Sequence, residues 1–286
     1  MDHAQRLIAT IPWGMKAWPL PGLQASSHIG FIAKFLSWSW LNERNMNLMA
    51  VCCNSAVMGQ GGKPRDHVAL CYFGSQLQGI SGWMAERIKE NVDLGWWGTD
   101  AAEKGYRYIH IPISLANTHW VVYRIDIEER TYCWGLSLAL TYVKAPTDSM
   151  DLGDSMGGSS YSKLMDVVRS AIERWTEAIF GTSFSNQGRV YKMGNQADVD
   201  SCGVCVINAI DASIHGTELF TNETRSMHRL RQFITAAEYL LEDTVRPLPV
   251  QPCFTCSLLL RTRLKWIWRP SSPRPLESSM LRHPQW

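Results

Sequence analysis

The sequence predicts an α+β domain, a mostly antiparallel central sheet flanked by helices. In segment 106–114, Ile109, Ile111 and Ile113 alternate with other residues, which is typical of a half-buried strand. After residues 160 and 202, apolar residues recur every three to four positions, which is the period of an amphipathic helix. The hydrophobic fraction of 45% and the charged fraction of 19% suit a globular protein.

The predicted sheet is built from consecutive segments. Segment 106–114 is followed by 119–127 and 132–140, and the polar break Glu128-Glu129-Arg130 separates the last two. Two apolar segments joined by a short polar break indicate an antiparallel hairpin. Segment 67–73 is apolar and predicts a further strand.

Helices are predicted before and after these strands. One begins after Asn42, the predicted N-cap, and another covers 80–92. A third is capped by Ser160 and ends at Gly181. Its apolar face consists of Leu164, Val168, Ile172, Trp175 and Ile179.

Two more helices close the predicted domain. One starts near Cys202, with Asp200 or Ser201 as its cap and Gly216 at its end, and its apolar stripe contains Val206, Ile207, Ile210 and Ile214. The last covers Thr224 to Leu241.

The chain is therefore divided into a poorly patterned segment 1–34, a compact domain 35–244 and a tail 245–286. Segments 59–65 and 145–160 are predicted loops within the domain. The tail holds seven of the thirteen prolines and is predicted to be disordered.

Charge is unevenly distributed along the 286 residues. From Arg246 to the end there are seven basic residues and one acidic residue, Glu277. The remaining 21 basic and 25 acidic residues give the body a net charge of −4. The overall charge of +2 is too small to indicate nucleic-acid binding, and no nucleic-acid partner is expected.

The eight cysteines are interpreted as free thiols. The start, Met1-Asp2-His3-Ala4, lacks the features of a secretory signal. Cysteines within apolar segments are typical of buried thiols, and they are Cys52, Cys53, Cys71, Cys133 and Cys205. We therefore expect an intracellular protein of the nucleus, the cytoplasm or both.

Neither a membrane span nor a cofactor is expected. No segment reaches the roughly 18 apolar residues that a transmembrane helix needs. The pair Cys253 and Cys256 lacks the further ligands of a metal site. A glycine-rich phosphate loop is also missing from the sequence.

The strongest candidate for a reactive side chain is Cys202. A thiol in the first turn of a helix faces unpaired backbone N–H groups and the helix dipole, which together predict a lowered thiol pKa. Gly203 beside it permits close approach of a substrate carbonyl. A cysteine buried at a helix start for packing alone remains the alternative.

Two further residues complete a candidate catalytic set. His119 can take the thiol proton and later protonate a leaving amine. Gln196, six positions before Cys202, can donate its amide N–H to a developing oxyanion. Each residue also has a structural interpretation when it is judged alone. His119 can be a histidine at the end of a strand without a catalytic role, and Gln196 can be an ordinary loop residue.

Taken together, these motifs resemble the SUMO-protease (sentrin-protease) family of papain-like cysteine peptidases over residues 38–242. Trp40-Leu41-Asn42 matches a family segment near the domain start, with Glu43 where Asp is usual. The segment 109–114 leading to His119-Trp120 looks like the approach to the family's histidine. Asp200-Ser201-Cys202-Gly203 is similar to its Asp-Cys-Gly motif with one extra Ser, and Arg229, Arg231 and Phe233 to its closing helix.

The resemblance implies roles for these residues. Cys202 would be the nucleophile, His119 the base and Gln196 the oxyanion donor. Trp40 and Trp120 would line a tunnel that admits the diglycine end of a SUMO- or NEDD8-like modifier, because glycines carry no side chains. A monomeric thiol protease without cofactor is expected.

One position departs from the family pattern. Leu136 stands where the family has an Asp or Asn that supports the histidine. Leucine cannot accept the imidazole N–H. In serine proteases, replacing the triad acid costs ~10⁴ in rate. Asp148, Asp151, Asp154, Glu128 and Glu129 are not placed by the pattern to substitute for it.

Three functions are compatible with these motifs. The chain is an active peptidase or isopeptidase for a ubiquitin-like modifier, with activity weakened by Leu136. Alternatively, it is a degenerate pseudoprotease that binds the modifier without efficient cleavage. As a third interpretation, the same fold acts on a viral- or transposon-type polyprotein or another peptide.

Overall fold

The computed structural model describes residues 2–15, 28–58, 65–80, 82–137 and 158–245. The chain divides into two compact units, Met1–Thr244 and Val245–Trp286. Nearly all of the second unit and most of the predicted loops 59–65 and 145–160 lie outside the described residues. The candidate residues His119, Gln196 and Cys202 all belong to the first unit.

A five-stranded sheet forms the centre of this unit, in the order β1-β2-β3-β4-β5. The long strands β2 (Tyr108–Leu115), β3 (His119–Asp126) and β4 (Thr131–Leu136) pair antiparallel, as predicted. The short outer strands β1 (Asp66–Val68) and β5 (Ser185–Asn186) pair in parallel with their neighbours. The sheet as a whole is therefore mixed, and the α+β fold class is confirmed.

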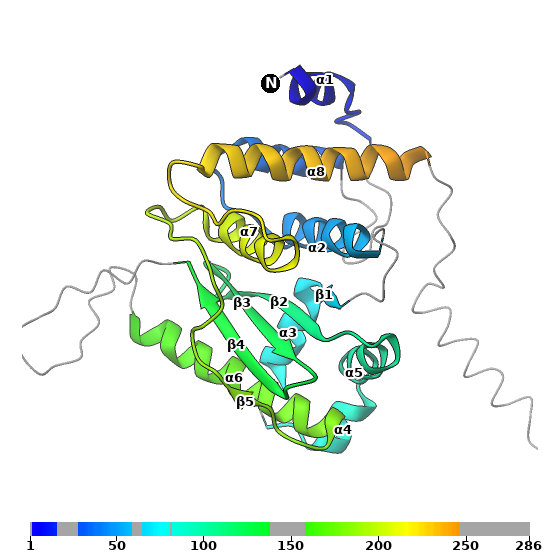
Figure 1. The fold of residues 1–286 in the computed structure, drawn as a ribbon, viewed down its shortest axis with the longest axis vertical. Coiled ribbons are helices and arrows are strands. Elements are labelled where there is room, and N and C mark those ends of the chain that lie inside the picture. Colours follow the sequence, from blue (N-terminus) through cyan, green and yellow to red (C-terminus); the bar gives the residue numbers. More distant parts are fainter. Residues whose placement is uncertain (1, 16–27, 59–64, 81, 138–157, 246–286) are drawn as a thin grey trace, which may run out of the picture. The chain divides into compact units, whose positions relative to one another are not determined.

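Helices cover both faces of the sheet (Figure 1). On one face, residues of α2 (Glu43–Met58), α7 (Cys202–His215) and α8 (Arg225–Val245) share a core with Trp120 and Val122. On the other, α3 (Cys71–Gly79), α5 (Val92–Lys104) and α6 (Gly158–Phe180) pack with Val121, Tyr123 and Ile125. Because side chains alternate along β3, this one strand contributes to both cores.

Helix ends follow the local chemistry that the sequence predicts. The side-chain oxygen of Asn42 accepts from the backbone N–H groups of Arg44 and Asn45, which caps α2. Gly181 and Gly216 follow α6 and α7 with positive φ angles of 73° and 70°, where a side chain would be strained. The predicted cap Ser160 is wrong, because α6 already begins at Gly158.

Two predicted elements are divided differently in the structure. The strand expected over 67–73 ends at Val68, and α3 starts at Cys71, whose N–H donates to the Asn47 side chain. The helix expected over 80–92 is reduced to α4 (Ala85–Glu90). Asn91 then caps α5 by accepting from Asp93 and Leu94, which starts a new helix.

The N-terminal segment contains structure that its weak pattern did not predict. It forms α1 (Asp2–Thr10) and the 3-10 helix η1 (Ile29–Leu36). Leu7 and Ile11 pack into the same core as α8. Residues 2–15 and 28–34 therefore contribute to the compact unit.

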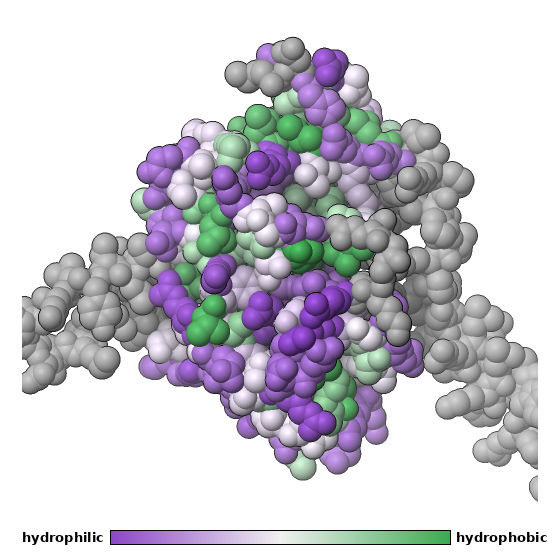
Figure 2. Space-filling model, in the orientation of Figure 1, coloured by the Kyte–Doolittle hydropathy of each residue, from purple (hydrophilic) through white to green (hydrophobic). Residues whose placement is uncertain are grey.

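Six cysteines among the described residues are free and buried, including the five predicted to be. Within the described ranges, no helix combines the length and apolarity that crossing a bilayer requires. The same part of the chain holds no cluster of three metal-ligating side chains. The face seen in Figure 2 is mainly hydrophilic, with hydrophobic residues in separate groups.

Trp175 of α6 is the largest fully buried side chain in the core that α3, α5 and α6 form against the sheet. Its side chain is fully buried, and its indole N–H donates to the carbonyl of Leu94 at 3.0 Å. We expect Trp175→Ala to lower the free energy of unfolding by about 3–5 kcal/mol, measured by chemical denaturation. Val167→Ala, on the exposed side of the same helix, is the matched control, and an equal loss in both variants would contradict this account.

Candidate active site

Cys202 is the first residue of α7, at the point where that helix meets the start of β3. Its side chain is fully buried. The indole Nε1 of Trp40 donates a hydrogen bond to Cys202 Sγ at 3.1 Å. Backbone hydrogen bonds from Trp120, Gly203 and Cys202 itself also reach the sulfur. Several N–H donors therefore surround the one thiol.

The predicted lowering of the Cys202 pKa is wrong. Burial raises the pKa of the thiol above its usual value, because removing the thiolate from water disfavours the charged form. Hydrogen bonds from the Trp120 backbone, the Trp40 indole and the helix start lower it, but they offset the burial only in part. In this resting conformation the thiol is mainly protonated at neutral pH.

Two indole rings pack at the start of α7. Trp40 and Trp120 are stacked, with ring centroids 5.5 Å apart and planes 20° apart. The indole N–H of Trp120 donates to the carbonyl of Leu41 at 2.7 Å, which fixes that ring. A Cβ on Gly203 would lie 3.0 Å from Leu41 and 3.3 Å from Trp120, so glycine allows this tight packing.

Gln196 lies buried beside the helix start, and its amide is held at both ends. Its Oε1 accepts from the Ser137 hydroxyl at 2.7 Å, and its Nε2 donates to the carbonyl of Asp198 at 2.7 Å. Because a carbonyl can only accept, the amide nitrogen must face Asp198. One amide hydrogen remains available for another acceptor.

Asp198 organises the loop before α7, a role that the sequence reasoning missed. Ser201 occupies the N-cap position, but its side chain makes no capping bond. Instead, Asp198 Oδ1 accepts from the N–H groups of Asp200 and Ser201 at 2.9 and 2.7 Å. Asp198 Oδ2 accepts from the Ser201 hydroxyl at 2.8 Å. An aspartate two and three residues before backbone donors is an Asx-turn signal that could have been recognised.

Two arginines of α8 attach this loop to the segment that carries Trp40. Arg225 pairs with Asp198 Oδ2, and its guanidinium lies 3.8 Å from the centre of the Trp38 ring. Arg229 donates to the carbonyls of Asp200 and Ser39 at 3.1 and 3.2 Å. Helix α8 therefore connects two segments that are far apart in the sequence.

His119 opens β3, and its side chain is buried. It is the immediate neighbour of Trp120, whose backbone bonds the Cys202 thiol. The strand register pairs His119 with Leu115 and Val121 with Leu136. Since alternate residues share a face and Leu136 pairs with Val121, Leu136 lies diagonal to His119 on the neighbouring strand. Leu136 itself packs against apolar residues.

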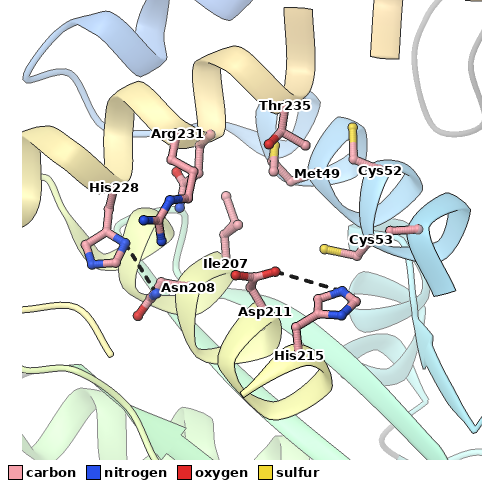
Figure 3. A pocket seen from close by; sticks show the side chains of 12 residues that line it. Met49, Cys52, Cys53, Ile207, Asn208, Asp211, His215, His228, Arg231 and Thr235 are labelled. Atoms are coloured by element: carbon pink, nitrogen blue, oxygen red, sulfur yellow. Dashed lines mark hydrogen bonds and ion pairs between the residues drawn. The ribbon is translucent and has the colours of Figure 1, made fainter. Parts of the chain in front are cut away.

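A separate cavity of about 110 Å³ lies between α2, α7 and α8. Figure 3 shows that Arg231, His228, Asp211 and His215 line it from α7 and α8, beside Cys53 of α2. None of Cys202, His119, Gln196, Trp40 and Trp120 lines this cavity. It is therefore distinct from the site around the thiol.

No family model and no curated protein matches the sequence. Solved structures do match: the SUMO protease Ulp1 with its catalytic cysteine oxidised to a sulfonic acid has a TM-score of 0.55 at 15% identity, covering 86% of this chain and 95% of that one. The C-terminal Ulp1 protease domain in complex with SMT3, the yeast ortholog of SUMO, has a TM-score of 0.52 at 16% identity, covering 86% and 95%. The fold is that of Ulp1, a papain-like cysteine protease fold.

The Ulp1-like fold confirms the architecture that the sequence motifs predicted. The roles of His119, Cys202, Gln196 and Leu136 stay predictions, because the likeness extends to the fold alone.

We expect Asp198→Ala to loosen the start of α7 and to lower the free energy of unfolding by about 1–2 kcal/mol at pH 7. Partial burial would raise the Asp198 pKa, but bonds from Arg225, Ser201 and the backbone hold it below its usual value. This stabilisation is therefore present at neutral pH and is lost as the pH falls below about 4.

Denaturation of the wild type and of Asp198→Ala between pH 7 and 2 measures this effect. The two stabilities converge at low pH, and a constant difference would contradict the proposed charge contribution. Asp198→Asn retains one oxygen that can accept the backbone hydrogen bonds. We expect its free energy of unfolding at pH 7 to lie between those of the wild type and Asp198→Ala. Glu103→Gln removes an exposed carboxylate on α5 and serves as the matched control.

Proposed function

We propose that this protein is a Ulp1-type cysteine peptidase or isopeptidase that cleaves after the C-terminal glycine of a ubiquitin-like modifier. One observation carries the proposal: in a Ulp1-like fold, the thiol at the start of α7 accepts a hydrogen bond from one of two stacked tryptophans, and a glutamine amide is held in the segment before that helix. The proposed residues come from separate parts of the chain: Cys202 begins α7, His119 begins β3, and Gln196 lies in the segment before α7.

The proposed substrate follows from the two indole rings. Trp40 and Trp120 are in contact, so a peptide can pass between them only after the rings separate. A diglycine end needs the smallest separation because it has no side chains. One solved structure with this fold is a complex with SMT3, the yeast ortholog of SUMO, which favours a modifier of that class.

In the proposed reaction, His119 takes the proton of Cys202, and the thiolate attacks the carbonyl carbon of the terminal glycine. The remaining amide hydrogen of Gln196 and the backbone N–H of Cys202 stabilise the oxyanion. The imidazolium protonates the leaving amine, and water then hydrolyses the thioester. Leu136 offers no acceptor to orient the imidazole, so the proposed reaction is slow.

Leu136 also supports a second candidate function, in which the protein binds a modifier without efficient cleavage. The raised pKa and complete burial of Cys202 point in the same direction. In this case the tryptophan pair still receives the diglycine end, but the thiol does not react.

A modifier carrying a thiol-reactive group at its C-terminus separates the two candidates. We expect a panel of SUMO-, NEDD8- and ubiquitin-based probes to label Cys202 covalently, detected as a mass increase of one modifier. Cys202→Ser is the matched control and removes the adduct. Tight binding without any adduct would favour the binding function and exclude the peptidase.

Restoring the acid tests whether Leu136 limits the reaction. We expect Leu136→Asp to increase hydrolysis of a modifier–fluorophore conjugate by about tenfold or more, because a carboxylate can orient and stabilise the imidazolium. Leu136→Ala opens the same space without an acceptor and is the matched control. Equal rates in the two variants would exclude this position as the acid position.

A further inference from the structure

Trp40 contacts the sulfur itself in addition to its ring partner. Its Nε1 lies 3.1 Å from Cys202 Sγ, and an indole nitrogen can only donate. A donated hydrogen bond strengthens when its acceptor becomes negative. Resting on the proposed function, we propose that Trp40 is a catalytic residue that stabilises the Cys202 thiolate through its indole N–H.

The direction of this N–H is fixed by the surrounding contacts. Trp40 stacks on Trp120, and Trp120 is in turn held by the carbonyl of Leu41, the residue after Trp40. The close packing of Gly203 against Leu41 brings the first turn of α7 against the same segment. The indole therefore presents its N–H to the sulfur from a constrained ring.

The need for such a donor follows from the other groups near the sulfur. Burial raises the pKa of the Cys205 thiol on the same helix, so that thiol is neutral and supplies no positive charge to the Cys202 sulfur. Arg229 of α8 favours the thiolate but is engaged with three backbone carbonyls, those of Lys34, Ser39 and Asp200. His119 lies at the start of β3, and Leu136 supplies no carboxylate to support an imidazolium there. A neutral N–H donor stabilises the thiolate without a charged partner.

The test is the pH dependence of Cys202 alkylation by chloroacetamide, followed by peptide mass spectrometry so that other thiols do not contribute. We expect Trp40→Phe, which keeps a stacking ring but lacks the N–H, to raise the midpoint of the profile by about one pH unit. This lowers the thiolate fraction about tenfold at any pH well below the midpoint. Trp38→Phe is the matched control, because Trp38 is exposed and contacts Arg225, and its profile should coincide with the wild type.

The midpoint separates a hydrogen-bonding role from a steric one. A ring that only covers the sulfur would change the alkylation rate at high pH and leave the midpoint in place, and that result would overturn the proposal. If Trp40→Phe does not fold, replacing Trp40 by benzothienylalanine removes the N–H from a ring of the same shape. An unchanged midpoint in that protein would overturn the proposal as well.

Alkylation needs no modifier, so the two proposals fail separately. A wild-type protein that cleaves no modifier, but whose alkylation midpoint depends on Trp40, refutes the proposed function and retains the role of Trp40. A protein that cleaves a modifier, with equal midpoints in the wild type and Trp40→Phe, gives the opposite result. If both hold, the hydrolysis rate of Trp40→Phe falls at neutral pH and recovers as the pH rises.

Discussion

The geometry of the site depends on the hydrogen bonds that the carboxylate of Asp198 accepts. It accepts the backbone bonds that turn the chain into α7, while the carbonyl of the same residue orients the Gln196 amide. Its partner Arg225 anchors the turn to α8. The residue that turns the chain toward the thiol therefore also contacts the amide of Gln196.

The sequence predicted what depends on local pattern and could not predict what depends on packing. Alternation predicted β2, the polar break predicted the β3–β4 hairpin, and periodicity predicted α6 and α7 with their terminal glycines. By contrast, α3 begins where Asn47, distant in sequence, provides a cap, and the segment was predicted as a strand. Local pattern contains no information about such a partner.

In the candidate site, too, local pattern predicted some features, while packing determined others. The spacing of Gln196 and Cys202 located the helix start, and the structure places both there. The pKa prediction was wrong because it counted the helix N-terminus and not the burial of the thiol in the folded core. Burial is a property of segments that meet only in the fold, as Trp40 and Cys202 do.

The contacts of α8 also determine when the site can form during synthesis. Ribosomal synthesis delivers the N-terminal part of a chain first, and domains fold as units. Trp40, His119 and Cys202 all emerge before Arg225 and Arg229, the residues that tie the loop before α7 to the Trp38–Trp40 segment. Until α8 has been synthesised, the nascent chain therefore lacks the contacts that join these two segments.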